Sequence, residues 1–121
     1  MAEIVITEFM EQSAVSSLAA DFDCLYDPRL VDDAARIHAM LADCRGLIVR
    51  NRTRVDAAMM DAAPNLRVIG RLGVGLDNID LDAAAERGIR VCPATGANAA
   101  CVAEYVLSLI HISEPTRPLY I

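Results

Sequence analysis

Residues 66–80, LRVIGRLGVGLDNID, take a short apolar run directly into a glycine-rich turn. The run predicts a strand over residues 66–69, with glycines 70, 73 and 75 at its carboxyl end. Asp80 can cap a helix over residues 81–87, and Gly88 stands where a helix takes a left-handed terminating residue. A further strand is predicted over residues 89–92, so this part of the chain alternates strand, helix and strand.

The same alternation extends over the preceding residues. Strands are predicted over residues 4–7, 22–26 and 46–50, and the last is a compact apolar run typical of a strand buried on both faces. Helices are predicted over residues 12–20, 30–41 and 55–63, with Asp32 or Asp33 to cap the second and Gly46 to end it. A last helix opens near Asn98. About five short strands alternating with helices predict an α/β fold, a doubly wound parallel sheet in one domain.

Composition narrows the function classes. The chain has 121 residues, which is room for one ordinary domain, and no lysine, which excludes Walker-type phosphate loops, pyridoxal enzymes and serine-lysine hydrolases. A net charge of -6 disfavours nucleic acid as a partner. The acids are concentrated in residues 1–33, whereas residues 45–71 hold six arginines against Asp56 and Asp61. That local positive field suits a small anion.

Cysteine spacing does not favour a metal site, and hydropathy does not favour a membrane-spanning segment. The four cysteines, at 24, 44, 92 and 101, form no CxxC pair and have no neighbouring histidine. We therefore predict no metal site and four reduced thiols. There is no charged-then-apolar leader and no apolar run of about 18 residues, so we expect a cytoplasmic protein with no membrane partner.

Polar groups follow two neighbouring strands of the predicted sheet. Arg50, Asn51, Arg52 and Thr53 come at the end of the strand over residues 46–50, and the glycine-rich turn follows the next strand. Because the carboxyl ends of parallel strands meet at one edge, we expect the two loops to face one crevice. Guanidinium, amide and backbone N–H groups there can hold a carboxylate, phosphate or sulfonate. At this point a tight turn without a ligand and solvated arginines remain open alternatives.

Other ligand classes of this fold fail on single residues. A G-x-G-x-x-G dinucleotide loop needs glycine at position 78, which is Asn78. Receiver-type signalling modules need clustered acids after the first strand and a lysine after the last, whereas Glu8 stands alone and lysine is absent. Flavodoxin-type mononucleotide binding needs a glycine-rich phosphate loop after the first strand, and residues 7–10 contain no glycine.

Several segments together resemble the D-isomer-specific 2-hydroxyacid dehydrogenases, in particular the phosphoglycerate and sulfolactate dehydrogenase branch. They are LIVRNRT at 47–53, VIGRLGVGLDNID at 68–80, GIRV at 88–91, Asn98, and VAE at 102–104. The similarity spans residues 1 to about 106. It implies that residues 1–106 are the substrate-binding (catalytic) domain, of flavodoxin-like topology. In the complete protein a separate Rossmann domain would follow and carry NAD.

The resemblance also implies roles for individual residues. The turn matching Val74 and Gly75 presents backbone N–H groups to the substrate carboxylate, and Val74 also touches the cofactor. Positions matching Arg50 and Asn51 hold the distal anionic end of the substrate, and Asn98 lies beside the reactive centre. Because Arg50 and Asn51 follow the pattern for a doubly anionic substrate, the implied substrate is a 2-hydroxy acid of the 3-phosphoglycerate or sulfolactate type.

The family's catalytic arginine, glutamate and histidine lie beyond the matching segment, so no catalytic residue is assigned here. We therefore expect the 121-residue chain alone to be inactive, and the full-length enzyme to be a homodimer or higher oligomer. A non-catalytic nucleotide-sensing or regulatory module of the same fold is the alternative.

The end of the chain departs from the pattern. Residues 107–117, LSLIHISEPTR, resemble the translation of a transposase sequencing adapter, and Pro115 and Pro118 prevent a helix from continuing. We expect residues 107–121 to be a non-native read-through tail that completes no packed element. In the family the helix beginning near Asn98 crosses to the absent domain. Its apolar face, Val102 and Val106, is therefore expected to stay exposed.

Overall fold

A computed structural model describes residues 3–73, 75–93 and 99–113 of the chain. Its sheet has five strands, all parallel, in the order β2-β1-β3-β4-β5. This is the flavodoxin-like order, so the predicted fold class is confirmed. The strands are β1 (Ile4–Ile6), β2 (Cys24–Tyr26), β3 (Gly46–Val49), β4 (Val68–Arg71) and β5 (Arg90–Pro93).

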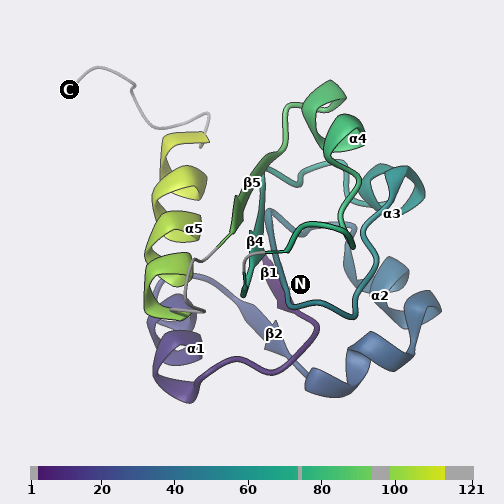
Figure 1. The fold of residues 1–121 in the computed structure, drawn as a ribbon. Coiled ribbons are helices and arrows are strands. Elements are labelled where there is room, and N and C mark those ends of the chain that lie inside the picture. Colours follow the sequence, from purple (N-terminus) through teal and green to yellow (C-terminus); the bar gives the residue numbers. More distant parts are fainter. Residues whose placement is uncertain (1–2, 74, 94–98, 114–121) are drawn as a thin grey trace.

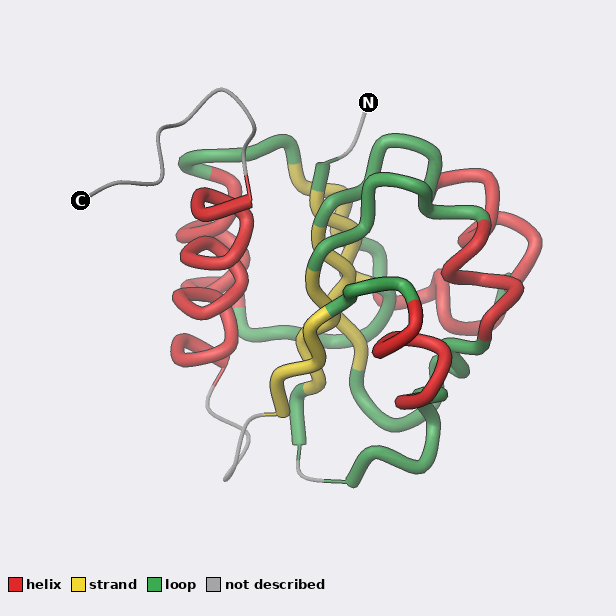
Figure 2. Tube along the Cα trace, turned by 90° about the horizontal axis from the view of Figure 1, so that it is seen from above, coloured by secondary structure: helices red, strands yellow, loops and turns green. Residues whose placement is uncertain are grey.

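Helices cover both faces of the sheet, as a doubly wound fold requires. They are α1 (Gln12–Ala19), the 3₁₀ helix η1 (Pro28–Asp32), α2 (Ala34–Met40), α3 (Ala57–Asp61), α4 (Leu81–Glu86) and α5 (Ala99–Ser113). Helices α1 and α5 lie on one face, and α2, α3 and α4 lie on the other (Figure 1). Seen from above, the strands separate the two groups of helices (Figure 2). Each face has its own apolar core, and β1, β3 and β4 contribute side chains to both.

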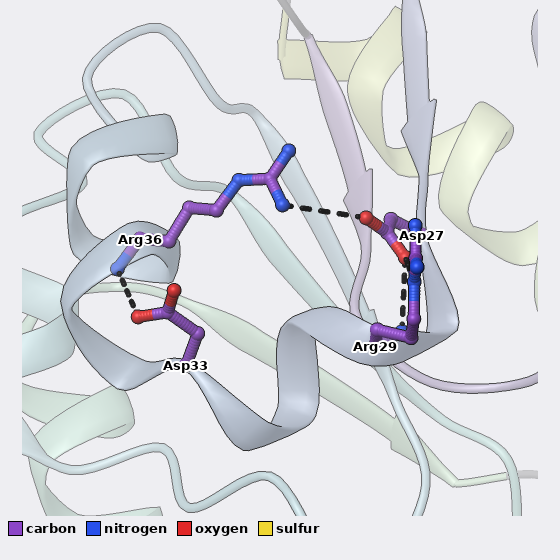
Figure 3. Close-up of polar contacts among 4 residues, drawn as sticks. All are labelled: Asp27, Arg29, Asp33 and Arg36. Carbon is purple, nitrogen blue, oxygen red and sulfur yellow. Dashed lines mark hydrogen bonds and ion pairs between the residues drawn. The ribbon is translucent and has the colours of Figure 1, made fainter.

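The predicted helix over residues 30–41 is two elements. Asp33, with φ −135°, breaks the chain between η1 and α2, and its carboxylate accepts a hydrogen bond from the Arg36 N–H at 3.1 Å. Asp27 caps η1 in the same way, through the Arg29 N–H at 3.0 Å (Figure 3). The prediction that Gly46 ends this helix was wrong, because Gly46 is the buried first residue of β3. Two caps in succession therefore replace one continuous helix.

Strand β4 begins and ends two residues later than predicted, so that Gly70 and Arg71 belong to it. A Cβ atom at Gly70 would lie 2.7 Å from Val102 Cγ1 of α5. Glycine therefore lets α5 pack closely on β4.

Helix α5 differs from the sequence expectation in both length and burial. It continues past Leu107 to Ser113, and Ile110 is fully buried in the same core as β1 and β4. Val102 and Val106, with exposed fractions of 3% and 0%, pack against β4. The prediction of an exposed apolar face was wrong, because β4 and α1 of this same chain cover it. The non-native origin of residues 107–121 stays a prediction.

Candidate functional site

The two polar loops of the sequence analysis lie side by side at the carboxyl edge of the sheet. Val49 and Arg71, which end β3 and β4, are paired in the parallel register, and the Leu72 N–H donates to the Val49 carbonyl at 2.8 Å. Further along, Val55 and Ile79 form a parallel bridge, with the Val55 N–H donating to the Asn78 carbonyl at 2.8 Å. The loops are therefore tied together at both of their ends.

A cavity of about 400 Å³ opens between these loops. Two of the predicted substrate-binding residues, Asn51 and Gly75, line it. Arg50 does not line it, because its Nη1 donates instead to the Phe9 carbonyl at 3.2 Å. Val74 and Asn98 lie outside the described residues. The full lining is Asn51, Arg52, Arg54, Arg71, Gly75, Asp77 and Asn78.

The cavity wall contains two residues to which the sequence analysis gave no role, Arg71 and Asn78. Arg71 is buried, and its guanidinium donates to the Leu72 carbonyl at 2.8 Å and to Asn78 Oδ1 at 3.4 Å. A Cβ at Gly73 would lie 2.1 Å from Arg71 Nη1, and Gly73 has φ +143°. The turn therefore favours glycine at 73 for its backbone conformation, and the guanidinium occupies the space beside it. The sequence analysis did not use the one local signal for this arrangement, an arginine at the end of an apolar strand.

Asn78 joins the two loops. Its Nδ2 donates to the Arg50 carbonyl at 2.9 Å and to the Thr53 carbonyl at 2.8 Å. With Oδ1 facing Arg71 Nε, the whole amide is used in fixing the cavity wall.

Glu8 is a further residue to which the sequence analysis gave no role. It is only 5% exposed, and its carboxylate accepts hydrogen bonds from three backbone N–H groups of the β3–α3 loop. These come from Arg50 at 2.8 Å, Thr53 at 2.9 Å and Arg52 at 3.2 Å. Beside it, the Thr7 and Thr53 hydroxyl groups lie 2.8 Å apart. No local pattern identifies such a residue, because its partners lie more than forty positions away.

Positive charge predominates around the cavity. Arg52 is paired with Asp32 at 2.6 Å on the exposed side of its loop. Arg54 is exposed and makes no hydrogen bond or ion pair with another described residue. Asp77 is the single acid among the lining residues, against three arginines. This set of guanidinium and amide donors favours an anion.

The three cysteine side chains that the structure describes do not offer a nucleophile. Burial raises the pKa of Cys24 to about 11, of Cys44 to about 12 and of Cys92 to about 11, so all three stay protonated at neutral pH. These three are free thiols, as predicted, and the side chain of Cys101 lies outside the described residues. Within residues 3–73, 75–93 and 99–113, no His, Cys, Asp or Glu side chains gather in a group of three or more that could hold a metal ion. In the same ranges no helix has the length and apolar character needed to cross a bilayer.

The glycine-rich segment does not form a dinucleotide-binding turn. Gly70 lies within β4, and the chain then runs through a loop to Asp80 before α4 begins. The first turn of α4 is capped by the Asp80 carboxylate, which accepts from the Ala83 N–H at 3.0 Å. A pyrophosphate needs a glycine turn that opens directly onto a free helix N-terminus. The described residues therefore offer no binding site for the pyrophosphate of NAD.

Comparison with known proteins assigns the family. The model of the D-isomer specific 2-hydroxyacid dehydrogenase catalytic domain matches residues 4–112. The chain is 54% identical over 108 residues to the (S)-sulfolactate dehydrogenase of Chromohalobacter salexigens, covering 89% of this chain and 35% of that protein. It is 38% identical over 109 residues to the D-3-phosphoglycerate dehydrogenase of Mycobacterium leprae, covering 88% and 20% respectively.

A solved structure agrees with the sequence matches. The PH0520 protein from Pyrococcus horikoshii superimposes with a TM-score of 0.68 at 27% identity, over 93% of this chain and 33% of that one. The chain thus spans about a third, or less, of the length of these proteins. With the strand order, the paired loops and the match over residues 4–112 in agreement, the chain belongs to the D-isomer specific 2-hydroxyacid dehydrogenase family, within whose catalytic domain it lies.

Proposed function

We propose that this chain is the substrate-binding part of a longer NAD-dependent oxidoreductase. It would act on the CH–OH group of a D-2-hydroxy acid of the 3-phosphoglycerate or sulfolactate type. The observation that carries the proposal is the arginine-lined cavity between the β3–α3 and β4–α4 loops. Its volume of about 400 Å³ suits a small metabolite.

A doubly anionic substrate needs two groups of donors. The turn at Val74 and Gly75 is proposed to hold the carboxylate through backbone N–H groups, as the resemblance implies. The distal phosphate or sulfonate would then meet the guanidinium groups across the cavity. Arg54 is the best placed, since it lines the cavity and has no partner among the described residues. Arg50 would have to leave the Phe9 carbonyl to contribute.

NAD enters the proposal through the family resemblance, and its site would lie mainly in the remainder of the protein. The residues of this chain bind and orient the hydroxy acid. A substrate held at the carboxyl edge of the sheet would have its C2 hydroxyl free to face catalytic groups from the rest of the full-length protein.

Binding by the 121-residue chain tests the proposal, with NMR shifts of backbone amides as the readout for 3-phosphoglycerate and for D-lactate. We expect Arg54→Gln to raise the Kd for 3-phosphoglycerate about tenfold, the equivalent of one charge-assisted hydrogen bond. D-lactate has no distal anion, so its binding should change little. Arg67→Gln is the matched control. Arg67 is an exposed arginine directly before β4, at the amino end of the strands and so away from the cavity.

Arg50→Ala separates the two candidate arginines. If Arg50 holds the distal anion, as the resemblance implies, this variant weakens 3-phosphoglycerate binding and Arg54→Gln does not. Equal loss of both ligands in the Arg54 and Arg67 variants would contradict an anion site at this cavity.

A further inference from the structure

The loop that brings Asn51, Arg52 and Arg54 to the cavity is held by a buried carboxylate from another segment. Glu8, in the loop after β1, accepts from the N–H groups of Arg50 and Thr53 through Oε2, at 2.8 and 2.9 Å, and from Arg52 through Oε1, at 3.2 Å. Three backbone donors converging on one carboxylate form the arrangement that binds free anions in other loops. Here the anion is part of the chain.

Glu8 lies in the loop after β1, at the carboxyl end of the sheet. The chain leaves β1 for α1 on one face and leaves β3 for α3 on the other, so the switch point of this sheet lies between β1 and β3 (Figure 1). Doubly wound sheets bind ligands in the crevice at such a point. In this chain the buried Glu8 carboxylate binds the β3–α3 loop from the β1 side, and the open cavity lies on the other side, between the β3 and β4 loops.

The opposite side of the same loop is also fixed. Asn78 Nδ2 donates to the carbonyls of Arg50 and Thr53 at 2.9 and 2.8 Å. With the N–H groups held by Glu8 and the carbonyls held by Asn78, this backbone has little freedom to turn. Arg52 and Arg54, which line the cavity, extend from this fixed backbone.

We infer that Glu8 is a positioning residue for substrate recognition, acting through the backbone of residues 50–53 and touching no substrate itself. This inference rests on the proposed function, since it assigns Glu8 the task of presenting the anion-binding arginines. An ionised carboxylate suits this place because both of its oxygens accept hydrogen bonds, and three backbone N–H groups have to be accepted. A glutamine would turn its NH₂ group toward at least one backbone N–H, and an aspartate is one methylene too short.

The test uses the 121-residue chain with Glu8→Gln and Glu8→Asp, and Glu11→Gln as the matched control. Glu11 is an exposed acid in the same loop, and its side chain makes no cap hydrogen bond with α1. Amide hydrogen exchange by NMR reports on residues 50, 52 and 53, and titration gives the Kd for 3-phosphoglycerate and D-lactate. For Glu8→Gln we expect at least tenfold faster exchange at these three amides, with unchanged exchange within β3. The Kd for 3-phosphoglycerate should rise about tenfold and that for D-lactate much less.

Glu8→Asp keeps the charge and should give a smaller change of the same kind, which covers the case in which Glu8→Gln does not fold. The inference would be overturned if both Glu8 variants exchanged at the wild-type rate, or if Glu11→Gln gave the same change. It would also be overturned if exchange became faster in the Glu8 variants while their affinity for 3-phosphoglycerate stayed unaltered. A wild-type chain that binds neither ligand would instead count against the proposed function. The exchange rates would then still show whether Glu8 fixes the loop.

Discussion

Asp27 illustrates how one side chain sets a local junction. Its carboxylate accepts from the Arg29 N–H at 3.0 Å and faces Arg36 Nη1 at 3.5 Å, joining the end of β2 to α2 (Figure 3). The backbone hydrogen bond from Arg29, followed by the charges of Arg29 and Arg36, lowers the pKa of Asp27 below its ordinary value.

A lowered pKa in the folded state gives a pH dependence of known sign. The ionised form is favoured by folding, so its contribution is present above the ordinary pKa of about 3.9 and is lost as the pH falls through the folded-state value. We expect Asp27→Asn to make the free energy of unfolding less dependent on pH in the acid range, measured by urea titrations. Asp43→Asn is the control, an exposed carboxylate without a partner among the described residues. An unchanged pH profile in Asp27→Asn would contradict this account.

At the scale of elements, the contact between β4 and α5 depends on the absence of one methyl group. A Cβ at Gly70 would lie 2.7 Å from Val102 Cγ1 and 3.3 Å from Val106 Cγ2. Gly70→Ala should therefore lower the free energy of unfolding by about 1–3 kcal/mol, as overpacking in cores usually does. Urea unfolding at neutral pH measures the change.

Val102→Ala provides the matched background for this test. It removes the Cγ1 atom that would clash, so Gly70→Ala should cost much less in the double variant than alone. The same cost in both backgrounds would show that α5 does not rest on Gly70 as described.

At the scale of the whole molecule, binding and redox chemistry are proposed to belong to different parts of the full-length protein. The described residues form an arginine-lined cavity but no pyrophosphate turn, and the chain spans 35% of the sulfolactate dehydrogenase it matches. We expect the purified 121-residue chain to produce no NADH from any 2-hydroxy acid, measured by absorbance. The same residues joined to the rest of a family enzyme serve as the positive control. Turnover by the chain alone would contradict this division.

Local features of the sequence were sufficient for much of the fold. The alternation of apolar runs and helical periods indicated five parallel strands, and Asp80 and Gly88 cap and end α4 as expected, with φ +69° at Gly88. Caps and turns depend on residues a few positions apart, which is why they can be predicted from neighbouring letters. The position of the two polar loops at one edge followed from the parallel direction of their strands.

Contacts between distant segments were beyond such prediction. Glu8 and Arg50 are 42 positions apart, and Asn78 and Arg50 are 28 apart, so their hydrogen bonds depend on the order and register of β1, β3 and β4. The same holds for α5, whose apolar face was expected to be exposed and is buried on β4. Periodicity in the sequence shows that a helix has an apolar face. Which element covers this face is decided only when the sheet and both layers of helices assemble. The physical reason is that burial and hydrogen bonding between remote residues are properties of the packed chain.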